Sequence, residues 1–394
     1  MANASVSTAA FACSRASRNV GPLRGLRVIE LQGIGPAPFC GMLLADLGAE
    51  VISIARNSSP ADRSAQISER GKLSIALNLK VPEAVDVLLT LCEQSDVLIE
   101  GFRPGVTERL GIGPEACMAR NPRLVYGRMT GWGQTGPLSK AAGHDINYIS
   151  LSGALHAIGR AGDRPVPPLN LVGDFGGGAM FLAFGVMSAV FEAKRSGIGQ
   201  VIDASMVEGS AVLMHMMYAM KAQGQWDDVR GSNLLDGAAH FYDTYETADK
   251  KYISIGALEP EFYRLLVQLT GVDATEFSTH MDRKHWPALR VKLAAAIKQK
   301  TRGEWCAIME GTDACFAPVL SMSEASQHPH NQARGTFVEV AGIDQPAPAP
   351  RFSRSTPLVP RPATPAGSDT QAVLHSVGFS ALQIQSLRER GALT

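Results

Sequence analysis

Residues 26–54 decide the fold, and they read LRVIELQGIGPAPFCGMLLADLGAEVISI. The runs 26–31 and 50–54 are short, apolar and typical of buried strands. Between them, a Gly/Pro turn at 33–38 leads into helical sequence at 39–47, which Gly48 can end. A strand, a helix and a second strand in this order predict a βαβ unit and therefore a parallel sheet.

The same alternation continues along the chain. It predicts further strands at 97–99, 124–126 and 200–203, and helices at 84–95, 174–194 and 206–222. A second α/β pattern follows a polar exit at 223–237, with a strand at 251–255 and helices at 260–269 and 286–298. The Pro/Ala-rich stretch 346–365 lacks periodicity and predicts an extended crossing segment before a last helix at 380–391. The chain is therefore expected to be an α/β protein with a larger and a smaller domain.

Composition excludes several classes of partner. Lys+Arg and Asp+Glu both number 37, so the formal net charge is +0 and no basic footprint for nucleic acid is present. The six cysteines form no CxxC pair, which argues against a disulfide scaffold or a zinc site and predicts a thiol-reduced, intracellular chain. The uncharged run 175–191 is too short for a membrane span and carries glycines, so a buried core helix without stable membrane insertion is expected.

The N-terminal extension, residues 1–22, leaves the compartment open. Its first 20 residues are rich in Ala and Ser, carry Arg15 and Arg18, and precede the first acidic residue, Glu30. That composition fits a mitochondrial transit peptide, and a disordered extension or an early start codon fits it equally well. The final Ala-Leu-Thr is not a peroxisomal Ser-Lys-Leu signal. The expected location is cytoplasmic for a bacterial protein, and mitochondrial or peroxisomal for a eukaryotic one.

Common cofactor motifs are missing. The first turn begins Gly33-x-Gly35, but Pro38 replaces the third glycine of GxGxxG, and Arg56 stands where a ribose-binding acid is expected. The sequence contains no GxxxxGK[ST], HExxH or GxSxG. We therefore expect no metal and no redox cofactor.

Three stretches carry residues suited to acid–base chemistry. In Gly143-His144-Asp145 the histidine stands at a predicted helix start, where the helix dipole would keep it neutral as a general base requires, or where it would be a structural cap. Asp174 precedes Gly176-Gly177-Gly178 and could serve as an N-cap, as a chemical group, or as both. Three glycines are costly in a helix and indicate close approach by a ligand or by another backbone. Glu259 lies between a strand and a helix beginning at Pro260, where an acid is often only structural.

Basic residues stand where parallel sheets bind anionic ligands. They are Arg56 at a strand end, Arg70-Gly71-Lys72 in a loop, and Arg103 in Phe102-Arg103-Pro104-Gly105. Each of them could equally be a solvated surface side chain.

Several of these stretches together resemble the family III CoA-transferase superfamily. The resemblance extends from about residue 24 to the C-terminus, and its motifs are 28–31, 38–40, 45–49 and 102–105. A second set resembles the α-methylacyl-CoA racemase branch of that family: 143–148, 173–175, 207–209, 233–237, 256–260 and 311–315. Two departures, Gly101 and the missing acid before Arg56, affect the expected CoA contacts.

The resemblance implies a fold, an assembly and a site. The fold would be a Rossmann-like large domain (23–222, completed by 331–394) with a linker and small domain at 223–330, in a homodimer of interlocked subunits. His144 and Asp174 would be the catalytic pair, with Glu259 supporting the histidine. The CoA part of an acyl-CoA substrate would contact Arg56, Ala76, Leu77, Asn78, Leu79, Arg103, Gly143, His144, Asp145, Ile146, Asn147 and Tyr148. No further cofactor is implied, since CoA belongs to the substrate.

The expected reaction is epimerisation of (2R)- and (2S)-2-methylacyl-CoA through an enolate, with one acid/base group on each face of C2. Two alternatives stay open. One is a CoA-transferase in which Asp174 attacks the thioester and forms an acyl-enzyme anhydride. The other is a catalytically silent CoA-binding or assembly protein. The sequence does not specify the acyl chain, although Met206, Met214, Met216, Met217 and Met220 could form an adaptable apolar surface or simply a core.

Overall fold

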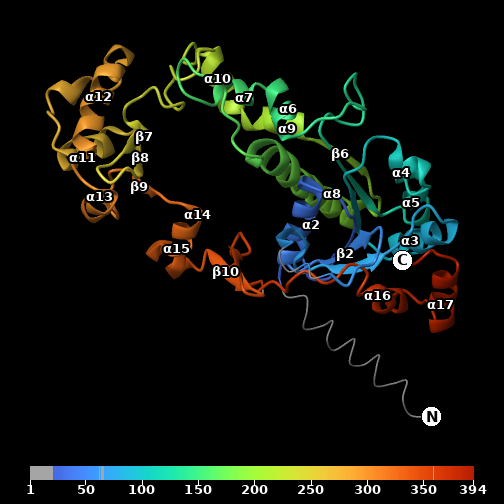
Figure 1. Ribbon diagram of the computed structural model, residues 1–394. Coiled ribbons are helices and arrows are strands. Elements are labelled where there is room, and N and C mark those ends of the chain that lie inside the picture. Colours follow the sequence, from blue (N-terminus) through green and yellow to red (C-terminus); the bar gives the residue numbers. More distant parts are fainter. Residues whose placement is uncertain (1–20, 62, 64–65, 358) are drawn as a thin grey trace. The chain divides into compact units, whose positions relative to one another are not determined.

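The computed structural model describes residues 21–61, 63, 66–357 and 359–394 (Figure 1). Nearly all of the N-terminal extension, and with it the predicted targeting segment, lies outside these residues. The chain divides into two compact units. The large unit contains the described part of residues 1–149 together with 170–213 and 334–394, and the small unit contains 150–169 and 214–333.

These boundaries differ from the expected 222/223 and 330/331. The predicted helix at 206–222 is two helices, α9 (Met206–Leu213) and α10 (His215–Ala222), and the division falls at the break between them. Residues 150–169 belong to the small unit, where Arg230 donates hydrogen bonds to the carbonyl oxygens of His156 and Asp163.

A six-stranded, wholly parallel sheet forms the centre of the large unit. Its strands lie in the order β3 (Leu73–Ala76), β2 (Glu50–Ala55), β1 (Arg27–Leu31), β4 (Val97–Glu100), β5 (Val125–Thr130) and β6 (Val201–Ser205). The predicted α/β fold and the five predicted strands of this sheet are confirmed, whereas β3 is not predicted from the sequence. The strand order reverses between β1 and β4, which is the switch point of a doubly wound fold.

Alternate residues of each strand pack against different helix layers. Val28, Val51 and Val97 pack with α2 (Pro36–Asp46) and α8 (Met180–Ser196). Ile29, Ile52 and Leu98 belong to the core of the other face. That face is covered by α3 (Pro82–Glu93), α5 (Pro114–Arg120), α16 (Thr370–Ser376) and α17 (Ala381–Glu389). The C-terminal helices, drawn in red beside α3, therefore belong to the core of the large unit (Figure 1).

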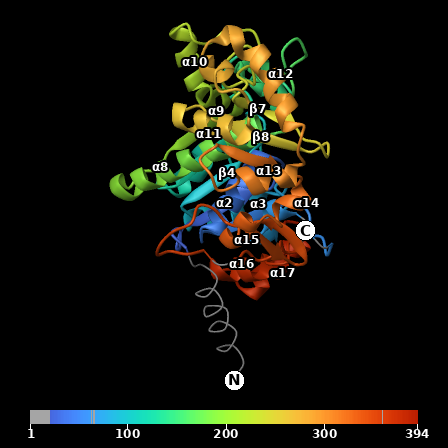
Figure 2. The ribbon, with the colours of Figure 1, turned by 90° about the vertical axis from the view of Figure 1, so that its left-hand side faces the viewer.

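The predicted helix at 174–194 begins differently from expectation. Residues Leu171–Ala179 form a π-helix, η2, which continues as α8. Among the described residues, the stretch Leu171–Ser196 is the one helix long and apolar enough to cross a membrane by length and composition. One face of α8 packs into the core through Leu182, Val186 and Ala189, while one end of the helix projects from the rest of the large unit (Figure 2).

The small unit contains an antiparallel sheet in the order β7 (Tyr242–Glu246), β8 (Tyr252–Gly256), β9 (Phe316–Val319). Only β8 is predicted from the sequence, because β7 and β9 carry polar residues and a proline. Helices α11 (Pro260–Thr270), α12 (Trp286–Ile297) and α13 (Arg302–Met309) complete its core around Phe241, Leu266 and Trp305.

The remaining elements of the two units are short. They are α4 (Val106–Arg109), α6 (Asp145–Leu151), α7 (Ala154–Ala157), η1 (Ile67–Glu69), η3 (Glu276–Thr279), η4 (Arg283–His285), α14 (Met322–Ala325), α15 (Pro329–Arg334) and the hairpin β10 (Phe337–Val340)–β11 (Ile343–Pro346).

Candidate active site

A cavity of about 530 Å³ opens in the large unit, where the switch point predicts a ligand. Its walls are the loop after β1 (Ile34–Ala37), the loop after β4 (Gly101–Pro104) and the end of β5. The segment that carries His144, Asn147 and Tyr148 also lines it, and so does Asp174. The fold therefore brings two of the three predicted catalytic side chains to one cavity.

His144 stands directly before α6, as its sequence context predicts. Its backbone N–H donates to Oδ1 of Asn147 at 3.0 Å, so the side chain at the third helical position closes the helix start. Tyr148 donates its hydroxyl to the carbonyl oxygen of Gly143, and its ring packs edge-on against Trp132 with centroids 4.8 Å apart. The imidazole of His144 is exposed in the cavity on a well-braced segment.

Asp174 lies inside η2 rather than before a helix, so the N-cap interpretation is wrong. A π-helical turn of this kind often marks a functional site. The Asp174 side chain is half-buried, and its Oδ2 accepts a hydrogen bond from Nδ2 of Asn170 at 3.1 Å. Its backbone N–H donates to Oδ1 of Asp145, at 2.6 Å.

The pKa of the Asp174 carboxyl is raised above its ordinary value. Burial is the main cause, and the negative charge of Asp145 adds to it, while the Asn170 hydrogen bond and His144 oppose it. A carboxyl group whose pKa is raised in this way is better suited to hold and release a proton than a solvated one.

The glycines next to Asp174 allow η2 to cross α9 at very short range. A Cβ built on Gly177 would lie 2.5 Å from the backbone nitrogen of Ser210. A Cβ on Gly209 would lie 1.8 Å from the carbonyl oxygen of Gly177. The close approach of the α9 backbone therefore explains the glycine run. This was one of the two explanations that the sequence left open.

Glu259 belongs to the small unit, where it precedes α11. It has the backbone conformation of an N-cap, but its side chain makes no capping hydrogen bond and is exposed. Burial raises the pKa of the neighbouring Cys315 thiol, and the charge of Glu259 raises it further. A purely structural capping role for Glu259 is thus not fulfilled.

The basic candidates separate into two groups. Arg103 lines the cavity, is exposed, and forms no ion pair with the part of the chain that the structure describes. Arg56 is exposed after β2 but does not line this cavity. Arg70 and Lys72, by contrast, are buried and fully engaged in ion pairs.

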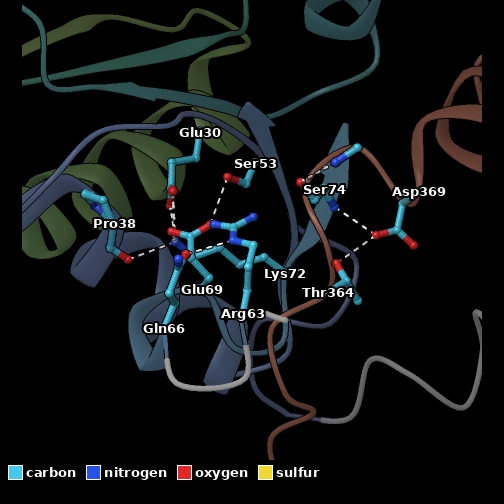
Figure 3. A network of polar contacts seen from close by, with 11 residues as sticks. Glu30, Pro38, Ser53, Arg63, Gln66, Glu69, Lys72, Ser74, Thr364 and Asp369 are labelled. Carbon is cyan, nitrogen blue, oxygen red and sulfur yellow. Dashed lines mark hydrogen bonds and ion pairs between the residues drawn. The ribbon is translucent and has the colours of Figure 1, made fainter. Parts of the chain in front are cut away.

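Figure 3 shows the environment of Lys72. Its Nζ lies 2.8 Å from both carboxylate oxygens of Glu30, 3.2 Å from Glu69 and 3.0 Å from the carbonyl oxygen of Pro38. Arg70 forms an equally buried fork with Asp46 and also donates to the side chain of Gln345, at 2.8 Å. These two residues therefore hold the fold together, and the expectation that their loop binds an anion is wrong.

The segment Ala76–Leu79 is not brought to the cavity either. Ala76 and Leu77 are buried, with 0% and 1% of their surface exposed. Leu77 forms a β-bridge with Leu393, and the backbone N–H of Asn78 donates to the carbonyl oxygen of Ala392. Leu79 packs against the core. The C-terminal segment pairs with this backbone, and contact of these four residues with CoA stays a prediction.

Two contributors to the site were missed from the sequence. Asn170 precedes Asp174 by four residues, and an i,i+4 polar pair is a signal that could have identified it. Trp132 lines the cavity, and its buried Nε1 has no hydrogen-bond partner among the described residues. The described residues contain no group of three or more His, Cys, Asp or Glu side chains arranged to hold a metal ion.

Comparisons with known proteins agree with this geometry. The sequence profile described as CoA-transferase family III matches residues 23–370. A mouse protein named alpha-methylacyl-CoA racemase is 48% identical over 368 residues, covering 93% of this chain and 96% of the relative. The human protein of that name is 45% identical over 368 residues, which also cover 93% of this chain and 96% of the relative. A crystal structure of a CaiB/BaiF family protein from Brucella suis superposes with a TM-score of 0.78 at 24% identity, covering 91% of this chain and 100% of that one, and so supports the fold.

Proposed function

Because this chain belongs to CoA-transferase family III, we propose that it epimerises (2R)- and (2S)-2-methylacyl-CoA thioesters. The observation that carries the proposal is that His144 and Asp174 line one cavity at the switch point of the sheet. The names of the mouse and human relatives agree with this reaction. The activity is therefore that of an isomerase acting on an acyl-CoA.

The chemistry needs two groups that exchange roles. One group removes the weakly acidic proton from C2 of the thioester, and the other returns a proton to the opposite face of the enolate. Histidine titrates near neutral pH and can act as base or acid. The raised pKa of Asp174 brings its carboxyl closer to the same range. We assign Asp174 and His144 to opposite faces of C2, so that each removes the proton from a different epimer.

The enolate oxygen must be stabilised as its charge develops. The first N–H groups of a helix have no partners within that helix, and they carry the positive end of its dipole. We propose that such groups at the start of α6, directly after His144, donate to the enolate oxygen. Proton transfer at C2 requires no electron acceptor, so we propose no cofactor beyond the CoA of the substrate.

The CoA moiety supplies phosphates that need a cation. Arg103 is suited to bind them because it is exposed at the cavity and has no ion-pair partner among the described residues. Arg56 stays a predicted phosphate contact outside this cavity, and the segment Gly143–Tyr148 stays a predicted contact of the CoA moiety. Glu259 stays a predicted member of the catalytic machinery, which a Glu259→Gln variant tests through kcat.

We also propose that the protein is a homodimer. Three large apolar side chains of α8 are exposed: Met180 at 52%, Phe184 at 74% and Phe191 at 73%. They are four and seven positions apart, so they lie along one side of the helix, and such an exposed apolar face often marks an interface. A second copy of the chain would cover them. Light scattering at micromolar concentration measures the mass, and a monodisperse monomer would contradict the proposal.

The decisive experiment uses each epimer of a 2-methylacyl-CoA in deuterated water. We expect deuterium at C2 and convergence of both epimers to one ratio. Asp174→Asn and His144→Gln should each abolish net inversion, because inversion needs both groups, and each should cost about 10² to 10⁴ in rate. The surface variants Asp86→Asn and His330→Gln serve as controls, since both side chains are exposed.

The same experiment separates the alternatives. A CoA-transferase would form an acyl-enzyme on Asp174 that hydroxylamine traps, and no deuterium would enter C2. That result would replace the racemase proposal. Tight CoA binding without turnover of either kind would instead indicate a CoA-binding protein.

A further inference from the structure

One buried guanidinium holds both ends of the loop that carries Arg103. Glu100 is the last residue of β4, and Arg128 of β5 is its direct register partner. Nε of Arg128 lies 2.9 Å from Oε1 of Glu100, and the two side chains are 8% and 0% exposed. A pair this well buried is costly to desolvate, so Arg128 must match the charge of Glu100 closely.

The upstream end of the loop is held through Glu100. The second carboxylate oxygen of Glu100 accepts a hydrogen bond from the backbone N–H of Phe102 at 2.6 Å. Phe102 is the residue directly before Arg103. The carboxylate thus bridges the guanidinium of Arg128 and the backbone that leads to Arg103.

The downstream end is held by the rest of the same guanidinium. Nη1 of Arg128 lies 2.8 Å from Oε1 of Glu108, and Nη2 lies 3.3 Å from Oγ1 of Thr107. Both residues belong to α4, which begins directly after Gly105. All three guanidinium nitrogens are therefore used, two of them on α4 and one on β4.

The loop between these two anchors needs such a restraint. It begins with Gly101 and ends with Gly105, which adopts φ +83°, and glycine permits more backbone conformations than any other residue. Gly101, Phe102, Arg103 and Pro104 all line the cavity. Where the loop lies therefore decides where the free charge of Arg103 is presented.

We propose that Arg128, acting with Glu100, is a positioning residue that presents Arg103 to the phosphates of the CoA moiety. This inference rests on the proposed binding of CoA at Arg103. The planar fork of arginine reaches three partners at fixed angles, which the single ammonium group of lysine cannot do. Removing the fork should weaken the capture of CoA without altering the acid–base chemistry at C2.

The test compares Arg128→Lys with a matched control, Arg27→Lys. Arg27 of β1 and Glu50 of β2 are also register partners, their Nε–Oε1 distance is 2.6 Å, and each is 11% exposed. They lie at the start of their strands and do not line the cavity. We expect Arg128→Lys to raise KM for a 2-methylacyl-CoA by about 10-fold with kcat within about twofold, the pattern of lost uniform binding. Arg27→Lys should leave both constants unchanged.

A double-mutant cycle shows whether the effect runs through Arg103. In the Arg103→Ala background, Arg128→Lys should have no further effect on KM, because the charge that it positions is gone. Equal, multiplicative effects in both backgrounds would overturn the proposal. So would a fall in kcat with KM unchanged.

Binding of CoA itself, measured by calorimetry, separates this inference from the proposed reaction. If the wild type binds CoA but exchanges no deuterium at C2, the proposed reaction fails, while a Kd about 10-fold higher in Arg128→Lys still supports the positioning role. If both proteins bind CoA equally, or neither binds it, the positioning role is wrong. Should Arg128→Lys fail to fold, Glu108→Gln removes the ion pair between Arg128 and α4 at a side chain that is 46% exposed. This variant should also raise the Kd for CoA.

Discussion

The crossing of η2 and α9 offers a sharp test of how Asp174 is positioned. In a Gly209→Ala variant, the new Cβ would lie 1.8 Å from the carbonyl oxygen of Gly177 and 2.6 Å from its carbonyl carbon. Carbon atoms pack at about 3.5–4.0 Å, so the two helices would have to separate by about 1 Å. Overpacking of this kind costs about 1–3 kcal/mol, and the better helix propensity of Ala returns at most about 1 kcal/mol.

The functional loss should exceed the loss of stability. Asp174 lies on the same π-helix, three residues before Gly177. A displacement of about 1 Å at a reacting group can cost about 10²-fold in rate. We therefore expect Gly209→Ala to destabilise the protein by about 1–2 kcal/mol and to slow C2 exchange by about 10²-fold.

Two measurements and one control decide the outcome. Urea unfolding gives the stability, and exchange of deuterium into C2 at saturating substrate gives the rate. The control is Gly185→Ala on α8, where the nearest atom to the new Cβ is Cγ2 of Ile202 at 3.2 Å, a side chain that can shift. Gly185→Ala should be neutral or stabilising with an unchanged rate. A Gly209→Ala variant with wild-type stability and wild-type rate would refute the role of the crossing.

Three further predictions follow from the charges and surfaces of the large unit. Asp145→Asn removes a negative charge that raises the pKa of Asp174, so the acid limb of the pH–rate profile should move to lower pH, and an unmoved limb would contradict this. Burial raises the pKa of Glu30 from 4.5 to about 7, so its proton is favoured in the fold; this stabilisation is complete below pH 4.5 and is lost as pH rises through 7. The loss amounts to about 3 kcal/mol, and Glu30→Gln should remove that slope from urea unfolding measured at several pH values. Phe184→Glu, at the exposed face of α8, should give a monomer in light scattering, whereas a persistent dimer would place the interface elsewhere.

Much of the fold could be predicted because its signals are local. The strands of a parallel sheet are buried on both faces and therefore appear as short, continuous apolar runs, such as 26–31. Strand β3 is as short as β4, but Ser74 interrupts its apolar run and Lys72 stands directly before it, so the run does not stand out. The π-helix was not predictable either. Its apolar residues fit an α-helical period equally well, and Asp174 before three glycines has the pattern of a helix start.

The residues of the candidate site divide in the same way, into those placed by local contacts and those placed by contacts distant in the sequence. His144 and Asn147 are three residues apart, and their helix start could be predicted from the sequence because the contact is local. The fate of the basic residues depends on partners far along the chain: Arg70 bonds to Gln345, 275 positions away. From the sequence, Arg70, Lys72 and Arg103 are equivalent loop cations. Folding neutralises the first two in buried ion pairs and leaves Arg103 exposed at the cavity.

The buried carboxylates cause this difference between the paired and the unpaired cations. Which carboxylate pairs with which cation could not be predicted from the sequence. Glu30, Asp46 and Glu100 are each buried and would each carry an uncompensated charge. Lys72 compensates the first, Arg70 the second and Arg128 the third. Each of these three acids thus pairs with a cation of the large unit, because leaving a charge buried and unpaired costs several kcal/mol. Arg103 forms no such ion pair among the described residues, so its charge is available for the phosphates of the proposed CoA substrate.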